Sequence, residues 1–511
     1  MEREARWEAV LGGVESGRLS IGDTGGDSHL RSIFMHNKRL FQVPNSIDAV
    51  DLRSYHLPMP PSSSPPHASR LTQELRLRGP TPSRQLRLRL GLSPATFTRT
   101  IACVRRDVVS DGATSSLVYA LRRPIPGLPG SIPIYEVGPG QVRLFATLHP
   151  VEPRGFFVDS PLPVRGFHPD LPWFLQDLRP AGFLGRLVPR QHPELGLPPD
   201  IQVWSGDHAL RWLHEWGVDT VGSLVVGDPA FARLHQAAPP VVAAGARAER
   251  YPALADAVMS LGLPGSSAAG EQPKFLATRL GDGEQTPVLV KFSPRVADRS
   301  TRRTADLLRC EHHALAAVRR AGIPAAESVV VAADDRVFLE VRRFDRRGEG
   351  RLGLVSLYSV AAHVGADVHS WTSAADELVN AGGIGEDDSQ RIYWLDRFGA
   401  LIGNTDRHAG NLSFFLVDGT VRAVAPVYDM LPMAYAIRSG EFATPSLLPP
   451  PPTPRFPGAW RGAWAAAEGF WNVVADDEAI DPELRAAARE NGALLHAHRG
   501  SLDRLPPEPG H

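Results

Sequence analysis

The hydrophobic and polar positions between residues 287 and 322 predict a strand followed by a long helix. The strand is the apolar run Pro-Val-Leu-Val-Lys-Phe at 287–292. In the next segment, residues 304–320, apolar side chains recur at helical spacing: Leu307, Leu308, Leu315 and Val318. Gly322-Ile-Pro then predicts the end of this helix. A strand-like run at 275–278 precedes this unit, and an extended segment at 337–346 follows it.

Two short hydrophobic stretches farther along the chain predict a β-hairpin. They cover residues 412–416 and 421–427, and Asp418-Gly419 between them is a turn sequence. The turn would carry Asp429 back beside Asn411.

The carboxy-terminal part predicts helices after a stiff, proline-rich segment at 446–454. Residues 460–474 and 482–498 are the two helical segments, which would close a carboxy-terminal lobe. Four tryptophans are interpreted as core anchors, because no basic stripe accompanies them: Trp371, Trp394, Trp460 and Trp464.

In the amino-terminal third the pattern predicts two short helices and a pair of strands. The first helix lies within residues 81–92 and ends at Gly91, and Ser93-Pro94 supply the N-cap and first-turn proline of the second. One face of the second helix carries Phe97, Ile101 and Val104, and its outer face carries Ala95, Thr98, Arg99, Ala102 and Arg105. Two strand-like runs about a polar turn follow at 108–123. This order predicts a winged helix-turn-helix domain.

Charge supports a nucleic-acid partner for that segment. Residues 71–123 contain ten arginines, no lysine and three acidic residues, whereas the whole chain has a net charge of −1. Arginines that reach DNA phosphates would give salt-sensitive affinity, with Thr98, Arg99 and Arg105 as the candidate DNA-binding residues. A small basic domain that binds a protein is the alternative interpretation.

The remaining composition predicts a cytoplasmic protein without disulfides. Only two cysteines occur, Cys103 and Cys310, in different predicted domains. No apolar stretch has the length of a membrane span, and no signal peptide is recognisable. Residues 1–70 have weak periodicity and are predicted to be a disordered extension.

Candidate chemistry is concentrated between residues 403 and 429. The chain reads Gly-Asn-Thr-Asp-Arg-His-Ala-Gly-Asn-Leu at 403–412 and Ala-Pro-Val-Tyr-Asp at 425–429. Phosphoryl transfer needs one carboxylate to position the attacking hydroxyl, together with an amide and a second carboxylate to hold Mg²⁺. Asp406, Asn411 and Asp429 occur in that order, and the step from Asp406 to Asn411 equals that of the protein-kinase catalytic loop. A pair that merely caps a turn is the plainer alternative.

Lysine usage favours the phosphoryl-transfer hypothesis. The chain has lysine only at positions 38, 274 and 291. Lys291 in its apolar strand matches the kinase lysine that pairs with phosphates and with a helix glutamate, for which Glu311 is the candidate. Lys274 follows a run of small residues whose backbone amides could approach a phosphate closely. A strand-end lysine that reaches solvent is the alternative for Lys291.

Residues 137–436 resemble the HipA family of serine/threonine kinase toxins, and in particular the YjjJ-type branch, whose members carry their own amino-terminal DNA-binding domain. The matching stretches are Leu-Pro-Trp-Phe-Leu-Gln-Asp-Leu-Arg-Pro-Ala-Gly-Phe-Leu-Gly-Arg at 171–186, Ser-Ala-Ala-Gly-Glu-Gln-Pro-Lys at 267–274, Val-Arg-Arg-Phe-Asp-Arg at 341–346, Asn-Thr-Asp-Arg-His-Ala-Gly-Asn at 404–411 and Val-Tyr-Asp at 427–429. Together these stretches are specific, although each alone is not.

The resemblance implies a role for each matching residue. Asp406 would be the catalytic carboxylate, Asn411 and Asp429 the Mg²⁺ ligands, Lys291 a contact of the ATP phosphates, and the backbone near Arg343 and Phe344 the cup for adenine. In this family a serine of the small-residue loop is an autophosphorylation site, which Ser267 matches best, with Ser266 adjacent.

The expected architecture is therefore α+β, with a winged helix-turn-helix followed by a bilobal, kinase-like domain. The expected segments are an extension (1–70), the DNA-binding domain (71–136), a HipA amino-terminal subdomain (137–250), the kinase N-lobe (251–345) and a helical C-lobe (346–511). The resemblance implies an ATP- and Mg²⁺-dependent kinase that inhibits growth by phosphorylating a protein such as a translation component. It also implies a protein that binds DNA to regulate its own operon. A homodimer is a possible assembly, and no membrane partner is expected. A small-molecule kinase and a nucleotide-sensing transcription regulator are the alternatives.

Overall fold

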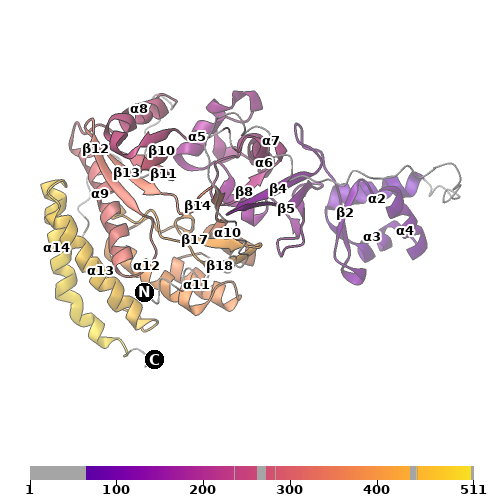
Figure 1. Ribbon diagram of the computed structural model, residues 1–511. Coiled ribbons are helices and arrows are strands. Elements are labelled where there is room, and N and C mark those ends of the chain that lie inside the picture. Colours follow the sequence, from indigo (N-terminus) through magenta and orange to yellow (C-terminus); the bar gives the residue numbers. More distant parts are fainter. Residues whose placement is uncertain are drawn as a thin grey trace, which may run out of the picture. The chain divides into compact units, whose positions relative to one another are not determined.

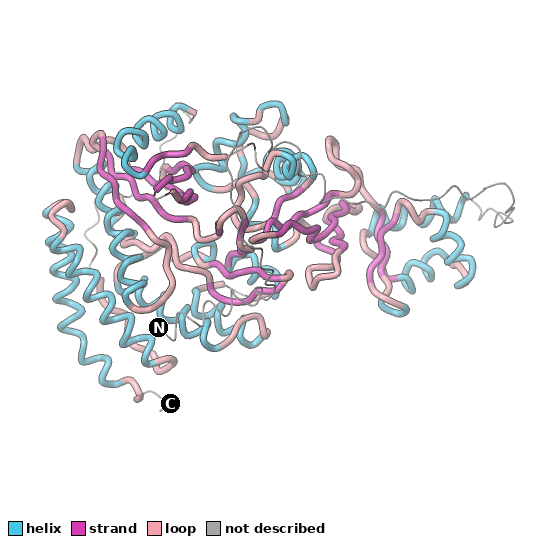
Figure 2. The backbone as a smooth tube through the Cα atoms, viewed as in Figure 1, coloured by secondary structure: helices cyan, strands magenta, loops and turns pink. Residues whose placement is uncertain are grey.

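The computed structural model describes residues 65–507 except 235, 237, 262–271, 282, 367, 438–444 and 446. Helices and sheets are mixed along this part of the chain, which agrees with the predicted mixed class (Figures 1 and 2). No helix of the described residues is both long enough and apolar enough to cross a bilayer.

The first described segment forms a small unit of three helices and three strands. Its elements are α2 (Pro65–Arg78), β1 (Thr81–Pro82), α3 (Ser83–Leu90), α4 (Pro94–Cys103), β2 (Val108–Asp111) and β3 (Val118–Leu121), and the strand order is β1-β3-β2. Ser93 caps α4 by accepting a hydrogen bond from the Thr96 N–H at 3.2 Å, as expected. Helix α2 begins at Pro65, so the expected boundary of the extension at residue 70 is wrong. Leu71 and Leu75, one helical turn apart, are fully buried against α3 and α4 and hold α2 in place.

The next unit is a five-stranded antiparallel sheet with helices. It contains β4 (Ile132–Gly138), β5 (Gln141–Pro150), β6 (Phe156–Asp159), β7 (Gly166–His168) and β8 (Leu224–Val226), in the order β7-β6-β5-β4-β8, with α5 (Gly182–Gln191), α6 (Gly206–Trp216) and α7 (Asp228–Ala232). The expected domain boundary after residue 136 falls inside β4 and is therefore wrong. Ile132 and Ile134 alternate into the core of this sheet, which fixes β4 there.

A second five-stranded sheet carries the predicted lysine strand. It contains β9 (Val241–Ala243), β10 (Lys274–Gly281), β11 (Glu284–Phe292), β12 (Ser328–Ala333) and β13 (Arg336–Arg342), in the order β12-β13-β11-β10-β9. Helix α8 (Arg247–Ser260) packs Tyr251 against Phe275 and Phe338 on one face. Helix α9 (Arg299–Arg320) packs Leu308 against Leu339 on the other face. The expected boundary after residue 250 is wrong, because it cuts α8 and separates β9 from its parallel partner β10.

The remaining elements form two small sheets, β14-β15 and β16-β17-β18, and a helical region (Figure 1). The strands are β14 (Arg346–Arg347), β15 (Gly350–Arg351), β16 (Leu354–Ser356), β17 (Ser413–Val417) and β18 (Thr420–Val424), and the helices are α10 (Leu357–Val364), α11 (Trp371–Asn380), α12 (Glu386–Leu401), α13 (Pro457–Asp476) and α14 (Pro482–His498). The predicted hairpin is β17–β18, whose second strand ends three residues early, and α14 has its predicted bounds. The four tryptophans predicted as core anchors are all buried.

Eight short 3-10 helices complete the described structure. They are η1 (Thr114–Ser116), η2 (Trp173–Leu178), η3 (Pro193–Leu195), η4 (Ile201–Val203), η5 (Ala244–Ala246), η6 (Ala409–Asn411), η7 (Met433–Tyr435) and η8 (Arg499–Arg504).

Asp306 of α9 contacts the residue that precedes α14. We expect its carboxyl group to make the free energy of unfolding depend on pH. Its buried Oδ2 accepts a hydrogen bond from the Asp481 N–H at 3.1 Å. Burial raises the pKa of Asp306 to about 6, so the folded protein pays for an ionised carboxylate above that pH. Stability from this group is thus full at low pH and falls as the pH rises from its ordinary pKa of 3.8 to about 6.

We therefore expect Asp306→Asn to be more stable, relative to wild type, at pH 7 than at pH 4.5. The relative gain in thermal midpoint between the two pH values should be about 2–4 °C, as measured by thermal unfolding. Asp503→Asn, at an exposed position, is the matched control. Parallel pH profiles for wild type and Asp306→Asn would contradict the assignment.

Candidate active site

Lys291 lies at the centre of a cluster of charged side chains between β11 and α9. Its Nζ donates to Glu311 of α9 at 2.7 Å (Oε1) and 2.9 Å (Oε2), and to Asp429 Oδ1 at 2.5 Å. Lys291 and Glu311 are buried, whereas about one third of the Asp429 side chain, 35%, is exposed. The strand–helix pair that the sequence pattern predicts is thus formed, and Asp429 adds a third member from the segment after β18.

The electrostatics of the cluster keep its lysine charged. Burial opposes the charge on Lys291, but the carboxylates of Asp429 and Glu311 outweigh it and raise the lysine pKa above its usual value. Burial also opposes the charge on Asp429, yet Lys291 and then Lys274 lower the pKa of this carboxyl. Asp429 therefore stays ionised near neutral pH.

Lys274 is the direct cross-strand partner of Lys291. The register of β10 and β11 places the two residues opposite each other, so their side chains leave the same face of the sheet. Like charges in opposite positions destabilise a sheet unless anions compensate them. Two of the three lysines in the chain thus share one site, where carboxylates, or the phosphates of a ligand, can balance them.

The loop that contains Asp406 and Asn411 is closed by hydrogen bonds from its own side chains. The Asp406 N–H donates to Asn404 Oδ1 at 2.9 Å, and Asn411 Nδ2 donates to the Asp406 carbonyl oxygen at 3.0 Å. The Arg407 Nε donates to Asp396 of α12 at 3.0 Å, which anchors the loop to that helix. The loop leaves Asp406 exposed, where its carboxylate can meet a hydroxyl from outside.

Tyr428 connects the Asp429 segment to the same loop. Its hydroxyl donates to the Gly410 carbonyl oxygen at 2.9 Å and lies 2.6 Å from Ser413 Oγ. Asp429 has a φ of 57°, an uncommon value for a residue other than glycine. The hairpin therefore returns the chain to the loop through Tyr428, and the next residue, Asp429, reaches Lys291.

Asn411 and Asp429 offer oxygen donors of the kind that Mg²⁺ prefers. Because the Asn411 Nδ2 faces the Asp406 carbonyl, its amide oxygen is directed away from that group. The described residues contain no cluster of three or more His, Cys, Asp or Glu side chains with metal-binding geometry. Mg²⁺ in nucleotide-dependent enzymes is commonly held by one or two carboxylates, with phosphates and water completing the coordination.

The two residues expected near adenine, Arg343 and Phe344, both make contacts within the chain. The Arg343 guanidinium is held by Asp219 Oδ1 at 2.7 Å and Asp345 Oδ2 at 3.0 Å, and its backbone N–H donates to the Pro287 carbonyl oxygen at 3.0 Å. The structure thus uses both donor groups of Arg343 internally. The ring of Phe344 packs against that of Tyr428, with 6.1 Å between the ring centroids, and Tyr428 directly precedes Asp429 in the chain.

Other predicted functional residues lie elsewhere. Ser266 and Ser267 fall outside the described residues. Thr98, Arg99 and Arg105 are exposed, and Phe97 and Val104 are buried. Thr98 and Arg99 lie on α4 as predicted, but α4 ends at Cys103, so Val104 and Arg105 lie in the turn after the helix.

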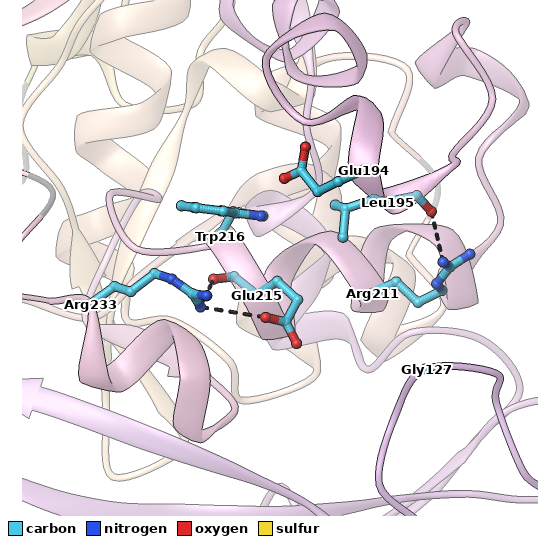
Figure 3. Close-up of a pocket in the computed structure, with 7 residues that line it drawn as sticks. All are labelled: Gly127, Glu194, Leu195, Arg211, Glu215, Trp216 and Arg233. Atoms are coloured by element: carbon cyan, nitrogen blue, oxygen red, sulfur yellow. Dashed lines mark hydrogen bonds and ion pairs between the residues drawn. The ribbon is translucent and has the colours of Figure 1, made fainter.

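Two cavities in the described part of the chain are lined by neither Asp406 nor Asp429. The first, of about 260 Å³, is lined by Gly127, Glu194, Leu195, Arg211, Glu215, Trp216 and Arg233. Figure 3 shows Arg233 held by Glu215, while Arg211 donates to the Leu195 carbonyl oxygen. The Arg233 guanidinium also lies over the ring of Trp216. The second, of about 230 Å³, lies between residues 218–239, strands β10 and β11, and hairpin β14–β15.

Comparisons with known proteins assign the chain to a family. Residues 128–235 match the family model of the YjjJ-like toxin middle domain, and residues 266–449 match that of the HipA-like C-terminal domain. The chain is 36% identical over 434 residues to Toxin YjjJ of Escherichia coli (strain K12), a match that covers 82% of this chain and 95% of that protein. A HipA-like C-terminal domain behind a YjjJ-like middle domain thus defines its class. The chain belongs to the YjjJ-like toxin family.

Two solved structures give weaker matches. A chain of the Shewanella oneidensis MR-1 complex of HipA, HipB and operator DNA is 17% identical, with 73% of this chain and 97% of that chain covered and a TM-score of 0.46. The Helicobacter pylori proinflammatory kinase CtkA is 15% identical, with 45% and 97% covered and a TM-score of 0.33. Both TM-scores lie below 0.5, so neither match adds support for the fold.

From the contacts of Lys291 we expect Glu311 to stabilise the folded, nucleotide-free protein. Glu311→Gln removes one of the two negative charges that compensate buried Lys291, at an expected cost on the order of 1–3 kcal/mol. The thermal midpoint of the nucleotide-free protein should therefore fall, and thermal unfolding would measure it. Glu478→Gln, at an exposed position, is the control. Equal midpoints for wild type and Glu311→Gln would show that the ion pair adds nothing.

Proposed function

We propose that the chain is an ATP- and Mg²⁺-dependent serine/threonine protein kinase of the HipA type. The observation that carries this proposal is the ion pair of Lys291 with Glu311 and Asp429, beside the loop that holds Asp406 and Asn411. A buried strand lysine held by a helix glutamate is the arrangement that positions nucleotide phosphates in protein kinases. The HipA-like C-terminal family match covers all five of these residues.

Each residue has a defined part in the proposed reaction. Lys291 and Lys274 hold the phosphates of ATP, and Asn411 and Asp429 hold Mg²⁺. Asp406 orients the hydroxyl of the acceptor and accepts its proton. In the described structure Asp429 is bound to Lys291, so loading the site replaces this contact by contacts to the metal and the phosphates. Bound ATP would supply its γ-phosphoryl group and leave as ADP, and Mg²⁺ held by Asn411 and Asp429 would neutralise the charge that develops on the phosphates.

The acceptor is, in this proposal, a hydroxyl on a protein. A component of translation would account for growth inhibition, consistent with the relative that is named a toxin. Ser267 and Ser266 are the proposed autophosphorylation sites. The protein would act in the cytoplasm, where ATP and translation components are available.

The amino-terminal unit would be a winged helix-turn-helix that binds DNA, with a homodimer bound to paired half-sites. Support comes from its element order, in which helices α3 and α4 are followed by strands β2 and β3, and from the exposed arginines of the unit, such as Arg99 and Arg105. In the solved Shewanella complex, HipA occurs together with HipB and operator DNA.

The kinase proposal predicts that binding and transfer can be separated by substitution. Asp406→Ala should lower the rate of phosphoryl transfer by about a thousandfold. ATP should still raise the thermal midpoint of this variant, because the phosphate-binding lysines remain. Lys291→Arg should weaken ATP binding instead, because a rigid guanidinium fork replaces a compact ammonium between two carboxylates. Intact and peptide mass spectrometry after incubation with Mg²⁺ and ATP would measure transfer, and calorimetry would measure binding.

The outcomes distinguish the alternatives. Phosphate on Ser267 or Ser266 that Asp406→Ala lacks would establish a self-modifying protein kinase. ATP binding without modification of the chain or of added proteins would favour a nucleotide-sensing regulator, and transfer to small molecules alone would favour a small-molecule kinase.

The DNA-binding proposal predicts a separate loss at Arg99. Arg99→Ala should weaken binding to a specific site by about 1–3 kcal/mol and relax its sequence preference, since a base-edge contact is removed. Fluorescence anisotropy at moderate salt would measure the change. Arg250→Ala, an exposed arginine of α8, is the control. Unchanged affinity and preference for Arg99→Ala would remove α4 from the interface.

A further inference from the structure

The second cavity lies where the YjjJ-like middle domain meets the kinase-like part. Val218 and Leu234 line it from the middle domain, Leu276 and Val288 from β10 and β11, and Arg346 and Arg351 from the hairpin β14–β15. Its walls thus combine aliphatic side chains with arginines.

Two arginines at this cavity are balanced by two aspartates. Arg343 donates to Asp219 and Asp345, and Arg346 donates to Asp219 Oδ1 at 2.8 Å and to Asp345 Oδ2 at 2.6 Å. Burial opposes the charge on Asp219, but Arg343 and Arg346 lower its pKa to about 2, so it is ionised at neutral pH. These four side chains form a neutral network.

Arg351 adds a positive charge beside this network. The hairpin register places it directly opposite Arg346, an unfavourable position for two like charges. Its NH1 donates to the Val218 carbonyl oxygen at 2.8 Å, an acceptor without net charge. Burial and then the charge of Arg346 lower the pKa of Arg351 to about 10. Glu349 also lines the cavity, but it is exposed at the hairpin turn, where water screens its charge.

We propose that this cavity binds a small organic anion, with the carboxylate or phosphate group held by Arg351 and the apolar body against Leu276 and Val288. The anion supplies a counter-charge for Arg351, since Asp219 and Asp345 already balance Arg343 and Arg346. A volume of about 230 Å³ is below the range of roughly 300–1,000 Å³ typical of pockets for drug-sized ligands, so the ligand is smaller than ATP. This site is separate from the phosphate-binding lysines and does not depend on the proposed kinase activity.

The test uses the full-length protein and three probes: inorganic phosphate, glycerol 3-phosphate and benzoate. Calorimetry should show binding of at least one probe, and a preference for glycerol 3-phosphate or for benzoate would identify a phosphate ester or a carboxylate as the natural group. Arg351→Gln should weaken that binding at least tenfold. Arg347→Gln, at the exposed neighbouring position of the same hairpin, should leave it unchanged.

Two further variants keep the proposal falsifiable. Leu234→Phe fills the cavity without removing charge and should also abolish binding, which covers the case in which Arg351→Gln does not fold. Lys291→Ala should retain binding, because its site is distinct. Equal loss in Lys291→Ala and Arg351→Gln would show a single nucleotide site that extends into the cavity and would overturn the proposal. Wild-type affinity in Arg351→Gln, or no binding of any probe at millimolar concentration, would overturn it as well.

Discussion

The ammonium group of Lys291 is withdrawn from water between a sheet and a helix, and the carboxylates that surround it come from two distant parts of the chain. Removing a charge from water costs several kcal/mol, and only well-placed opposite charges offset that cost. Glu311 supplies one such charge from α9, and Asp429 supplies the other from beyond the β17–β18 hairpin. Contacts with this one lysine therefore help to fix both the position of α9 on the sheet and the position of the segment after the β17–β18 hairpin.

A second charged network holds the middle domain against the HipA-like C-terminal domain. Asp219 contacts Arg343 and Arg346 from more than a hundred residues away, and Asp345 completes the set. Because all four side chains are largely withdrawn from solvent, removal of one would leave a buried charge without compensation. The middle domain is thus coupled electrostatically to the segment just after β13, a few residues from Phe344 and its contact with Tyr428.

Local signals explain what could be predicted from the sequence. The strand of Lys291, the helix of Glu311 and the β17–β18 hairpin each have their pattern within about twenty residues, and all three formed as expected. Helix α12 gave no such signal, because Asp388, Ser389 and Asp396 are among its buried residues and weaken its apolar periodicity. The predicted domain boundaries near residues 136 and 250 are wrong for another reason. The sheets to which β4 and β9 belong are set by pairing with strands β5 and β10, and no local sequence pattern reveals that pairing.

Both candidate binding regions share one physical feature, a pair of like charges opposed across a β-ladder. Lys274 faces Lys291, and Arg346 faces Arg351. A sheet gains nothing from such pairs, so an anion must compensate for them. At the first pair Glu311 and Asp429 do so, and Asp429 is partly exposed and could exchange for a ligand phosphate. At the second pair Asp219 and Asp345 bind Arg346 and Arg343, while Arg351 donates to a carbonyl oxygen. The two pairs differ in how much negative charge the chain itself provides. The lysine pair is balanced by the carboxylates of Glu311 and Asp429, whereas the arginine pair leaves Arg351 without a carboxylate, and we propose that an anion from solution binds there.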